Sequence, residues 1–225
     1  FIIEAWELMV IIFVSGSIAS EFNLSTVQVG SLIGSIYLGM IPGAYIFGII
    51  ADKIGRKKTM VYSLIGFSIF SLISVFSINF SMLYTSRLLA GVAISGVLVC
   101  IFPYFGELLP VKQRGKASGY LSSGWPFGVL IAVGITALST EIGGLLASWR
   151  SVLFISSMAG LWALVLMKLP ESPYWLVSKG RQKEAKQIIN YLSDGKVKVD
   201  ENVQLEILKV KQGSYLEIFK GKILK

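Results

Sequence analysis

Histidine is absent from this sequence of 225 residues, and cysteine occurs once, at Cys100. Without histidine, imidazole catalysis and histidine-ligated metal sites are excluded. A single cysteine excludes an internal disulfide framework. Charged residues are also scarce, at 15% of the chain, whereas a soluble domain carries about a quarter. Hydrophobic residues reach 54%, and this balance is typical of a membrane protein.

The excess of basic over acidic residues, a net charge of +8, is compatible with nucleic acid or with anionic lipid as a partner. In so apolar a chain we expect the basic residues to lie in loops that face lipid head groups. The sequence therefore predicts membrane lipid as a partner and no nucleic acid.

Long hydrophobic runs dominate the first three quarters of the chain. A hydrocarbon core of about 30 Å needs about 20 apolar residues in a helix. Six stretches meet this requirement, at roughly 1–20, 27–50, 59–78, 82–105, 117–138 and 150–168. The first contains Glu4 and Glu7, lacks a basic leader and does not start with methionine. We therefore expect a membrane span, not a signal peptide, and a natural N-terminus further upstream.

Basic residues gather in alternate connections between these stretches. They lie after the second stretch (Lys53, Arg56, Lys57, Lys58), after the fourth (Lys112, Arg114, Lys116) and after the sixth (Lys168, Lys179, Arg181, Lys183, Lys186). The other connections hold Glu21, Glu141 and an isolated Arg150. Because positively charged loops stay inside, the pattern predicts a multi-pass protein of the plasma (cytoplasmic) membrane with both termini in the cytoplasm.

Two regions follow from this reading, a membrane bundle over 1–169 and a basic cytoplasmic segment over 170–225. Residues 180–192 have apolar positions at helical spacing with charges between them, which predicts an amphipathic helix under the membrane. A weaker helix is predicted over 203–210, with a turn at Asp194-Gly195 between the two. On outer loops, the segments 23–25 and 79–81 are expected to cap the helices that follow them.

Small residues recur four apart inside the spans, a spacing that favours close helix packing. These pairs are Gly30 and Gly34, Gly39 and Gly43, Gly115 and Gly119, and Gly124 and Gly128. We expect them to pack helices together and to have no role in binding a solute.

Four sequence blocks together resemble the major facilitator superfamily, and more narrowly its sugar-porter and synaptic-vesicle-protein-like branch. They are GIIADKIGRK at 48–57, RLLAG at 87–91, ELLPVKQRGK at 107–116 and PESPYWL at 170–176, the last followed by Gly180-Arg181 and Glu184-Ala185. The resemblance covers nearly the whole chain. It implies an all-α membrane protein whose six transmembrane helices form the N-terminal half of a major facilitator fold, followed by cytoplasmic amphipathic helices.

The resemblance implies a gate at the cytoplasmic end of this half. Its residues are carried over as Asp52, Gly55, Arg56, Lys57, Glu107, Arg114 and Glu171. Asp52 can cap a helix and pair with the neighbouring cations, and Glu107, Arg114 and Glu171 are expected to join a charged network there. Because exposed ion pairs each contribute only about 0–1 kcal/mol, such a gate can open and close. Tyr174 stands where the family has an arginine, which removes one cation from the network.

Two charged residues lie within predicted spans, Glu7 in the first and Arg87 in the fourth. An ionisable residue inside a membrane is costly, and its presence indicates a functional site. In proton-coupled members of the family, an acid in the first helix pairs with the arginine of the fourth. We therefore expect Glu7 and Arg87 to couple a proton to transport, with Glu4 on the same helical face as a second carboxylate. An alternative is that Glu7 snorkels to the interface.

The sequence contains fewer indications of the chemical class of the solute than of the fold. Sugar-binding relatives have amides along the fifth helix, and none occurs in the stretch 120–130. A cavity that combines Trp6, Trp125, Ser122 and Ser123 with Arg87 favours an aromatic or carboxylated organic molecule. Two alternatives remain open, namely a sugar transporter, by uniport or proton symport, and a membrane scaffold or receptor that keeps the fold without transport.

No enzyme is expected, because the chain shows no nucleophile–base pair, phosphate loop or metal set, and no cofactor is expected. Transporters of this superfamily bind solute between two six-helix halves. A second half is therefore expected as a partner, either on the same polypeptide or as a second copy. The main hypothesis is secondary active transport of a small organic solute driven by protons.

Overall fold

The computed structural model describes residues 2–142, 148–193, 200 and 203–206. Its elements are α1 (Ile2–Phe22), α2 (Thr26–Ile54), α3 (Arg56–Val75), α4 (Phe80–Leu108), α5 (Val111–Ile142), α6 (Trp149–Ser157), the 3-10 turn η2 (Met158–Leu161), α7 (Trp162–Lys168), α8 (Pro173–Ser178) and α9 (Gln182–Leu192). Within these residues, six segments are long and apolar enough to cross a membrane, and α6, η2 and α7 together form the sixth. The predicted all-α fold with six spans is confirmed.

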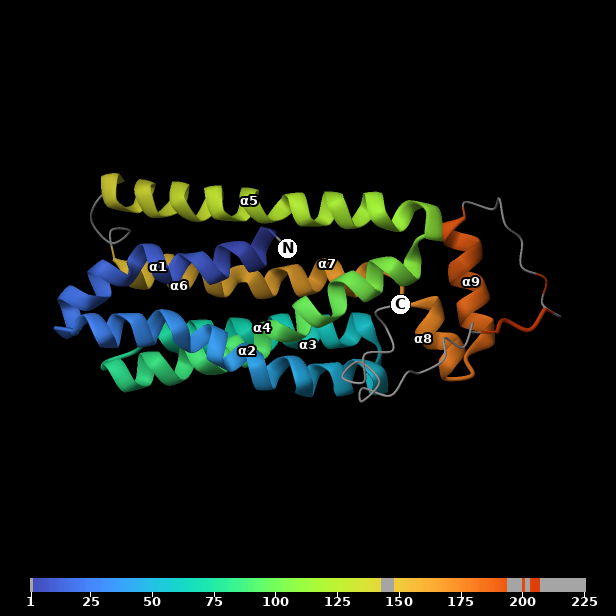
Figure 1. Cartoon of the computed structure of the whole chain (residues 1–225), viewed down its shortest axis with the longest axis horizontal. Helices are drawn as coiled ribbons and strands as arrows, with labels where there is room; N and C mark the ends of the chain where they lie inside the picture. Colours follow the sequence, from blue (N-terminus) through green and yellow to red (C-terminus); the bar gives the residue numbers. More distant parts are fainter. Residues whose placement is uncertain (1, 143–147, 194–199, 201–202, 207–225) are drawn as a thin grey trace, which may run out of the picture.

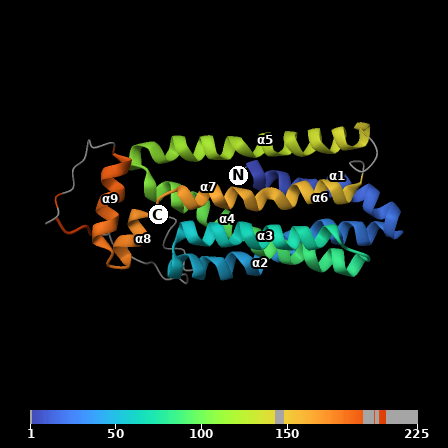
Figure 2. The same ribbon diagram turned by 180° about the vertical axis from the view of Figure 1, so that it is seen from behind.

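The spans run along a common direction as a bundle, with α5 along one edge and α2 along the other (Figures 1 and 2). α4 packs along both α2 and α3, and α1 packs along α5. Short connections make successive helices antiparallel. The ends of α2 and α4 and the starts of α3 and α5 therefore lie together, and α8 and α9 cover that end (Figure 1). We call it the α8 end.

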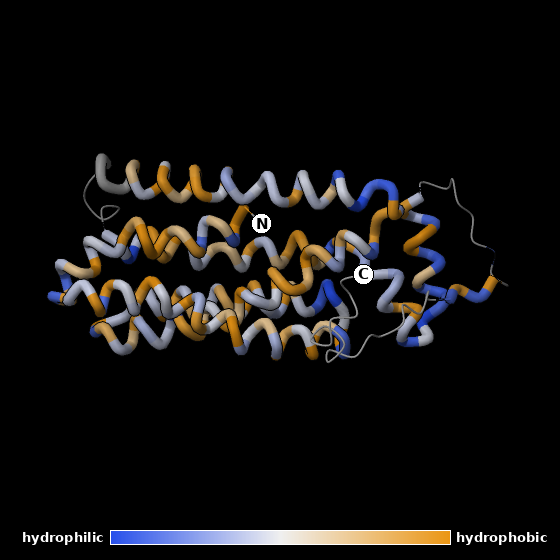
Figure 3. The backbone as a smooth tube through the Cα atoms, in the orientation of Figure 1, coloured by the Kyte–Doolittle hydropathy of each residue, from blue (hydrophilic) through white to orange (hydrophobic). Residues whose placement is uncertain are grey.

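Hydrophilic residues concentrate at the α8 end, and the long helices between the two ends are mainly apolar (Figure 3). Apolar side chains such as Ile41 and Tyr45 on α2 and Tyr120 on α5 are nevertheless more than two-thirds exposed. Exposed apolar surface along membrane-length helices is compatible with lipid or with another helical segment.

Glycines let α2 and α4 approach to backbone contact. A Cβ atom added at Gly39 would overlap the carbonyl of Leu88, and one at Gly91 would overlap the carbonyl of Ile36. At Gly43, an added Cβ would overlap both the backbone of α4 and a serine side chain. The expected packing role is confirmed here, because any side chain at these positions would push the two helices apart.

Of the remaining glycine pairs, one contacts a neighbouring helix and two do not. Gly124 and Gly128 of α5 face Ile2 and its neighbours on α1, as expected for a packing contact. An added Cβ would meet no atom within 4 Å at Gly30, Gly34, Gly115 or Gly119. For these four positions, the prediction of helix packing within this bundle is wrong.

Two helix starts have side-chain caps where the sequence placed them. Ser25 accepts a hydrogen bond from the backbone N–H of Gln28, and the Gln28 side chain accepts one from Ser25 N, which completes a capping box. Asn79 accepts from Met82 N at the start of α4. In the first segment the cap is Ser25, whereas Asn23 takes a left-handed conformation with φ 50° just after α1.

The sixth span is interrupted by η2. Ser68 of α3 bridges this interruption, because its hydroxyl accepts a hydrogen bond from Gly160 N at 2.6 Å and donates one to the carbonyl of Ser157. Gly160 is required at this point, since an added Cβ would overlap the Ser68 hydroxyl. A side chain of α3 therefore replaces backbone hydrogen bonds that a continuous helix would make.

Beyond the spans, α9 confirms the amphipathic helix predicted over 180–192. The Gln182 side chain donates to the carbonyl of Leu205 at 3.0 Å and accepts from its N–H at 3.1 Å. Residues 203–206 are thus held in a non-helical conformation, and for them the helix predicted over 203–210 is wrong. The remainder of that helix, and the turn at Asp194-Gly195, lie outside the described residues.

Candidate functional site

Arg87 is fully buried in α4, and serines of α3 hold its guanidinium. Its Nη2 donates to Ser71 Oγ at 2.8 Å, and its Nε donates to Ser74 Oγ at 3.0 Å. Ser71 and Ser74 are three residues apart, so they lie on the same face of α3. Nη1 has no hydrogen-bond partner in the described part of the chain. The guanidinium is therefore fixed in position, while Nη1 can still donate a hydrogen bond to another group.

Glu7 lies on α1 and is 1% exposed. Ser156 of α6 lies near its carboxylate, and the charge of Arg87 acts on it electrostatically. The two charges are not in direct contact, because no ion pair within 4.0 Å joins them among the described residues. The direct pairing expected between these spans is thus not formed among the described residues. Glu7 is nevertheless buried in the bundle and does not snorkel to its surface.

Glu4 lies one turn before Glu7 and is 3% exposed. It lines a cavity of about 440 Å³ between α1, α3, α4, α5 and α7, whose other lining residues are mainly apolar. One oxygen each of Glu4 and Glu7 has no hydrogen-bond partner within the described residues. Two carboxylates held away from water in this way are costly to retain, which supports a functional role for the pair.

The four residues expected to contact solute do not all lie together in the structure. Trp6 is half-buried, and its indole donates to Ser156 Oγ on α6 at 2.8 Å. Trp125, Ser122 and Ser123 are exposed on α5, where Ser123 donates to a carbonyl of its own helix. The cavity that Glu4 lines is bordered by none of these four side chains. The structure therefore does not bring Trp6 together with the three residues of α5.

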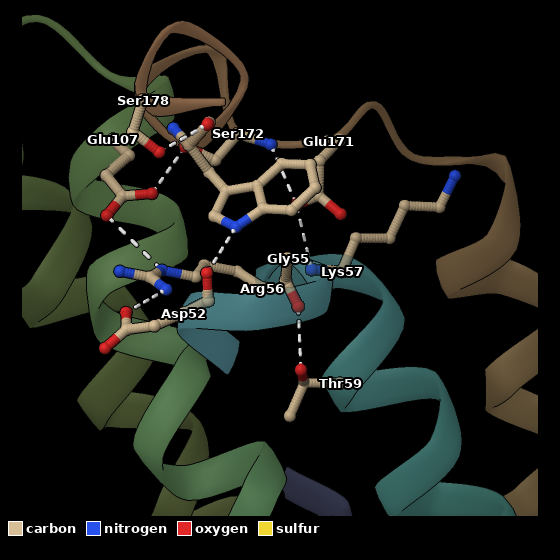
Figure 4. A network of polar contacts seen from close by, with 10 residues as sticks. Asp52, Gly55, Arg56, Lys57, Thr59, Glu107, Glu171, Ser172 and Ser178 are labelled. Carbon is tan, nitrogen blue, oxygen red and sulfur yellow. Dashed lines mark hydrogen bonds and ion pairs between the residues drawn. The ribbon is translucent and has the colours of Figure 1, made fainter. Parts of the chain in front are cut away.

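A second polar cluster lies at the α8 end and links four segments of the chain (Figure 4). Arg56 at the start of α3 pairs with Asp52 of α2 at 2.6 Å, and its Nε lies 3.6 Å from an oxygen of Glu107 on α4. Glu107 also accepts a hydrogen bond from the Ser172 hydroxyl. We call Asp52, Arg56, Glu107, Glu171 and Ser172 the α8-end cluster.

Glu171 caps α3 from a distance of more than one hundred residues in sequence. It accepts hydrogen bonds from the backbone N–H groups of Lys57 and Ser172, each at 3.0 Å (Figure 4). Gly55 precedes α3 with φ 105°, and an added Cβ there would overlap the Glu171 carboxylate. The carboxylate thus lies at the positive end of the α3 dipole. Glu171, and not Asp52 as expected, supplies this cap.

Asp52 and Arg114, two other residues of the expected gate, make weaker or different contacts from those expected. Asp52 belongs to the last turn of α2, and its side chain is 74% exposed, so its pair with Arg56 is screened by water. Arg114 is exposed on α5 and donates to the carbonyl of Leu109. The structure does not bring Arg114 into the α8-end cluster, contrary to the expected network.

We expect Glu171→Ala to loosen the start of α3 without unfolding the bundle. Loss of a capping carboxylate costs about 1 kcal/mol, which corresponds to roughly fivefold faster amide exchange at Lys57 and its neighbours if exchange follows local opening. Hydrogen–deuterium exchange measures this directly. Glu184→Ala is the control, because Glu184 of α9 forms an exposed ion pair with Arg181, away from the start of α3. Equal protection of α3 in both variants would contradict the capping role.

A third cluster, which was not predicted from the sequence, lies at the opposite end of the bundle. Arg150 pairs with Glu21 of α1 at 2.6 Å, donates to the carbonyl of Ser77 at 3.0 Å and lies over the ring of Trp149. Trp149 in turn donates to Glu21 at 2.6 Å. This cluster connects α1, the loop between α3 and α4, and the start of the sixth span. Only the adjacency of Trp149 and Arg150 in the sequence hints at it.

α8 was also not predicted, although the sequence carried a signal for it. Ser172 accepts from Trp175 N as a helix cap, and Pro173 occupies the first turn. Serine followed by proline is typical of a helix start. The Trp175 indole donates to the carbonyl of Asp52 at 3.1 Å, so α8 is attached directly to the end of α2.

Comparison with known proteins is consistent with this architecture. Residues 8–224 match the family model for sugar (and other) transporters. Synaptic vesicle glycoprotein 2B of Mus musculus is 31% identical over 198 residues, which cover 84% of this chain and 29% of that protein. The major myo-inositol transporter IolT of Bacillus subtilis is 30% identical over 188 residues, covering 83% and 40%. The chain thus spans less than half the length of these relatives.

Among solved structures, the fold is similar to that of the proton:xylose symporter XylE bound to 6-bromo-6-deoxy-D-glucose. The TM-score is 0.77 at 22% sequence identity, over 85% of this chain and 47% of that chain. The match covers the N-terminal half of a major facilitator fold. With the family model matching most of its length, the chain is a multi-pass membrane protein that belongs to the sugar (and other) transporter family, a family of transporters and not of enzymes.

Proposed function

We propose that this chain forms the N-terminal half of a secondary transporter that couples the movement of a small hydroxylated solute, a sugar or a polyol, to a proton. The observation that carries the proposal is the burial of Glu7 and Arg87 in one bundle, where serines of α3 hold the guanidinium. With no histidine in the chain, a buried carboxylate is the natural proton carrier. Arg87 supplies the positive charge that would favour its ionised form.

The choice of solute differs from the organic or aromatic acid expected from the sequence. Trp6 is directed at α6, which weakens the aromatic cavity on which that expectation rested. The family name and the inositol-transporting relative support a sugar or polyol instead. Amides are missing from 120–130 of α5, but a hydroxylated solute can be bound by donors on other helices.

We propose that solute binds between this half and a second six-helix half, on the same polypeptide or as a second copy. The match to about half of the related transporter structures supports this, as do the exposed apolar faces of α2 and α5. The α8-end cluster would then act as the gate, together with Gly55 and Lys57 at the start of α3. Because Lys53, Lys112 and other basic residues gather at that end, we place it in the cytoplasm, with the protein in the plasma membrane.

Uptake into proteoliposomes tests the proposed function. The protein that contains this chain is reconstituted, and labelled myo-inositol, xylose, glucose and benzoate are compared with and without an inward proton gradient. We expect gradient-dependent accumulation of a hydroxylated solute and none of benzoate. Accumulation of benzoate alone would restore the organic acid, and gradient-independent uptake would indicate a uniporter. Saturable binding without flux would indicate a scaffold or receptor.

A further inference from the structure

The guanidinium of Arg87 is held along one edge by two hydroxyl groups. Its Nη2 donates to Ser71 Oγ at 2.8 Å, and its Nε donates to Ser74 Oγ at 3.0 Å. These two nitrogens lie on the same side of the planar group, an edge with which arginine can bind both oxygens of a carboxylate. Here two serine oxygens from α3 occupy the places of the carboxylate oxygens. The contact therefore has the form of an arginine–carboxylate pair without its negative charge.

All three side chains lie inside the bundle. Arg87, Ser71 and Ser74 are each 0% exposed. In the ranges that the structure describes, no carboxylate oxygen lies within 4.0 Å of the Arg87 nitrogens. A buried charge is costly unless hydrogen bonds satisfy it, and arginine does not lose its proton at physiological pH. Arg87 is therefore a fixed positive charge whose hydrogen-bond partners do not cancel it.

The hydroxyl protons of the neighbouring serines are directed away from the guanidinium. Arginine only donates hydrogen bonds, so Ser71 and Ser74 accept with their oxygens. The proton of Ser74 has two acceptors within reach, the carbonyl of Phe70 at 2.9 Å and the hydroxyl of Ser86 at 2.8 Å. Ser86 donates to the carbonyl of Leu83 at 2.9 Å. The hydroxyl dipoles thus present their oxygens to the charge, which stabilises it without neutralising it.

A buried serine on α3 does not by itself imply a contact with Arg87. Ser63 lies on the same helix and is also 0% exposed, but its hydroxyl has no hydrogen-bond partner within the described residues. Ser71 and Ser74 differ because they lie three residues apart on one face of α3, at the level of the guanidinium. Ser63 therefore provides a matched comparison for them.

We propose that Ser71 and Ser74 are positioning residues of the transport site, which hold Arg87 by one edge and leave its charge uncancelled. This inference rests on the proposed function, in which Arg87 supplies the positive charge of the proton site. Nη1 has no hydrogen-bond partner in the described part of the chain, so the guanidinium keeps a donor for an anionic group that binds and leaves during transport. A carboxylate at either serine position would hold Arg87 more strongly but would neutralise it permanently.

The hold on Arg87 is tested by NMR of the protein that contains this chain, labelled with nitrogen-15 arginine in lipid nanodiscs. Arg87→Lys removes the Arg87 Nε–H signal and thereby identifies it. In Ser74→Ala we expect this proton to exchange with water at least about tenfold faster, because a hydrogen bond to a charged group is lost. Ser74→Thr keeps the hydroxyl and should restore slow exchange, and Ser63→Ala should leave the rate unchanged. Equal rates in Ser74→Ala and the wild type, or the same acceleration in Ser63→Ala, would overturn the proposal.

A matched pair of variants at Ser71 separates the charge from mechanical support. Asparagine and aspartate have nearly the same size and both offer an oxygen as acceptor, but only aspartate adds a negative charge. We expect Ser71→Asn to retain proton-driven uptake in proteoliposomes and Ser71→Asp to lose it, with slow Nε–H exchange in both. Equal uptake by the two variants would contradict the claim that the charge must stay uncancelled. If the wild type accumulates no solute, the proposed function fails, and the NMR comparison alone decides whether α3 holds Arg87.

Discussion

Glu7→Gln is expected to abolish proton-driven accumulation of solute. A proton gradient of one pH unit can support up to about tenfold accumulation in a one-to-one symport, and the ratio should fall to one in the variant. The reason is that glutamine keeps the size and hydrogen-bonding capacity of the side chain but cannot release or take up a proton. Accumulation in proteoliposomes at imposed pH gradients measures the effect, while downhill exchange of solute should continue.

Glu4→Gln is the appropriate comparison. Glu4 is also buried and lies one turn away, but the charge of Arg87 acts on Glu7. We therefore expect coupling to persist in Glu4→Gln, with a reduced rate if the second carboxylate contributes to proton transfer. Circular dichroism and elution as a single species would verify that both variants fold. Coupling that survives in Glu7→Gln but not in Glu4→Gln would transfer the proton site to Glu4.

The largest loss of stability is expected at the contact between α2 and α4. Gly39→Ala and Gly91→Ala each place a methyl group into the carbonyl of the facing helix, so the helices must separate along their length. Overpacking typically costs about 1–3 kcal/mol, and we expect the upper end here, because backbone atoms cannot rotate away. Unfolding by sodium dodecyl sulfate in mixed micelles, monitored by circular dichroism, measures the difference.

Gly34→Ala provides the matched control on the same helix. An added Cβ at Gly34 meets no atom within 4 Å, so the substitution changes only the backbone propensity. Alanine is favoured over glycine in a helix by about 1 kcal/mol, and this variant should be as stable as the wild type or slightly more so. A Gly39→Ala protein as stable as Gly34→Ala would show that the close helix contact is absent in the membrane.

The spans could be predicted from the sequence because a membrane imposes one requirement on all of them, a long apolar run. Glu7 and Arg87 stood out for the same reason, since a charge within such a run has few structural explanations. The alternating positions of the basic residues also predicted which helix ends lie on the same side of the membrane. The α8-end cluster lies at the end predicted to carry these basic residues.

The partners of those charges could not be predicted in the same way. Ser71, Ser74 and Ser156 are neutral and resemble the other serines of the spans in sequence. Which of them faces a charge depends on the rotation of each helix about its axis, and this is set by packing. The cap of α3 by Glu171 depends likewise on a segment that returns to the bundle after four more helices. Local spacing favoured Asp52 because it is close in sequence, whereas the fold brings Glu171 closer in space.

The interruption of the sixth span at η2 has a mechanical consequence. The first segment, α6, is attached to α1 through Arg150 and Ser156, while the second segment, α7, continues toward α8. Between them, the hydroxyl of Ser68 stands in for rigid backbone bonds. A tilt of α6 can therefore be absorbed at this interruption, so that movement at the Arg150 end of the bundle need not be transmitted to the α8 end.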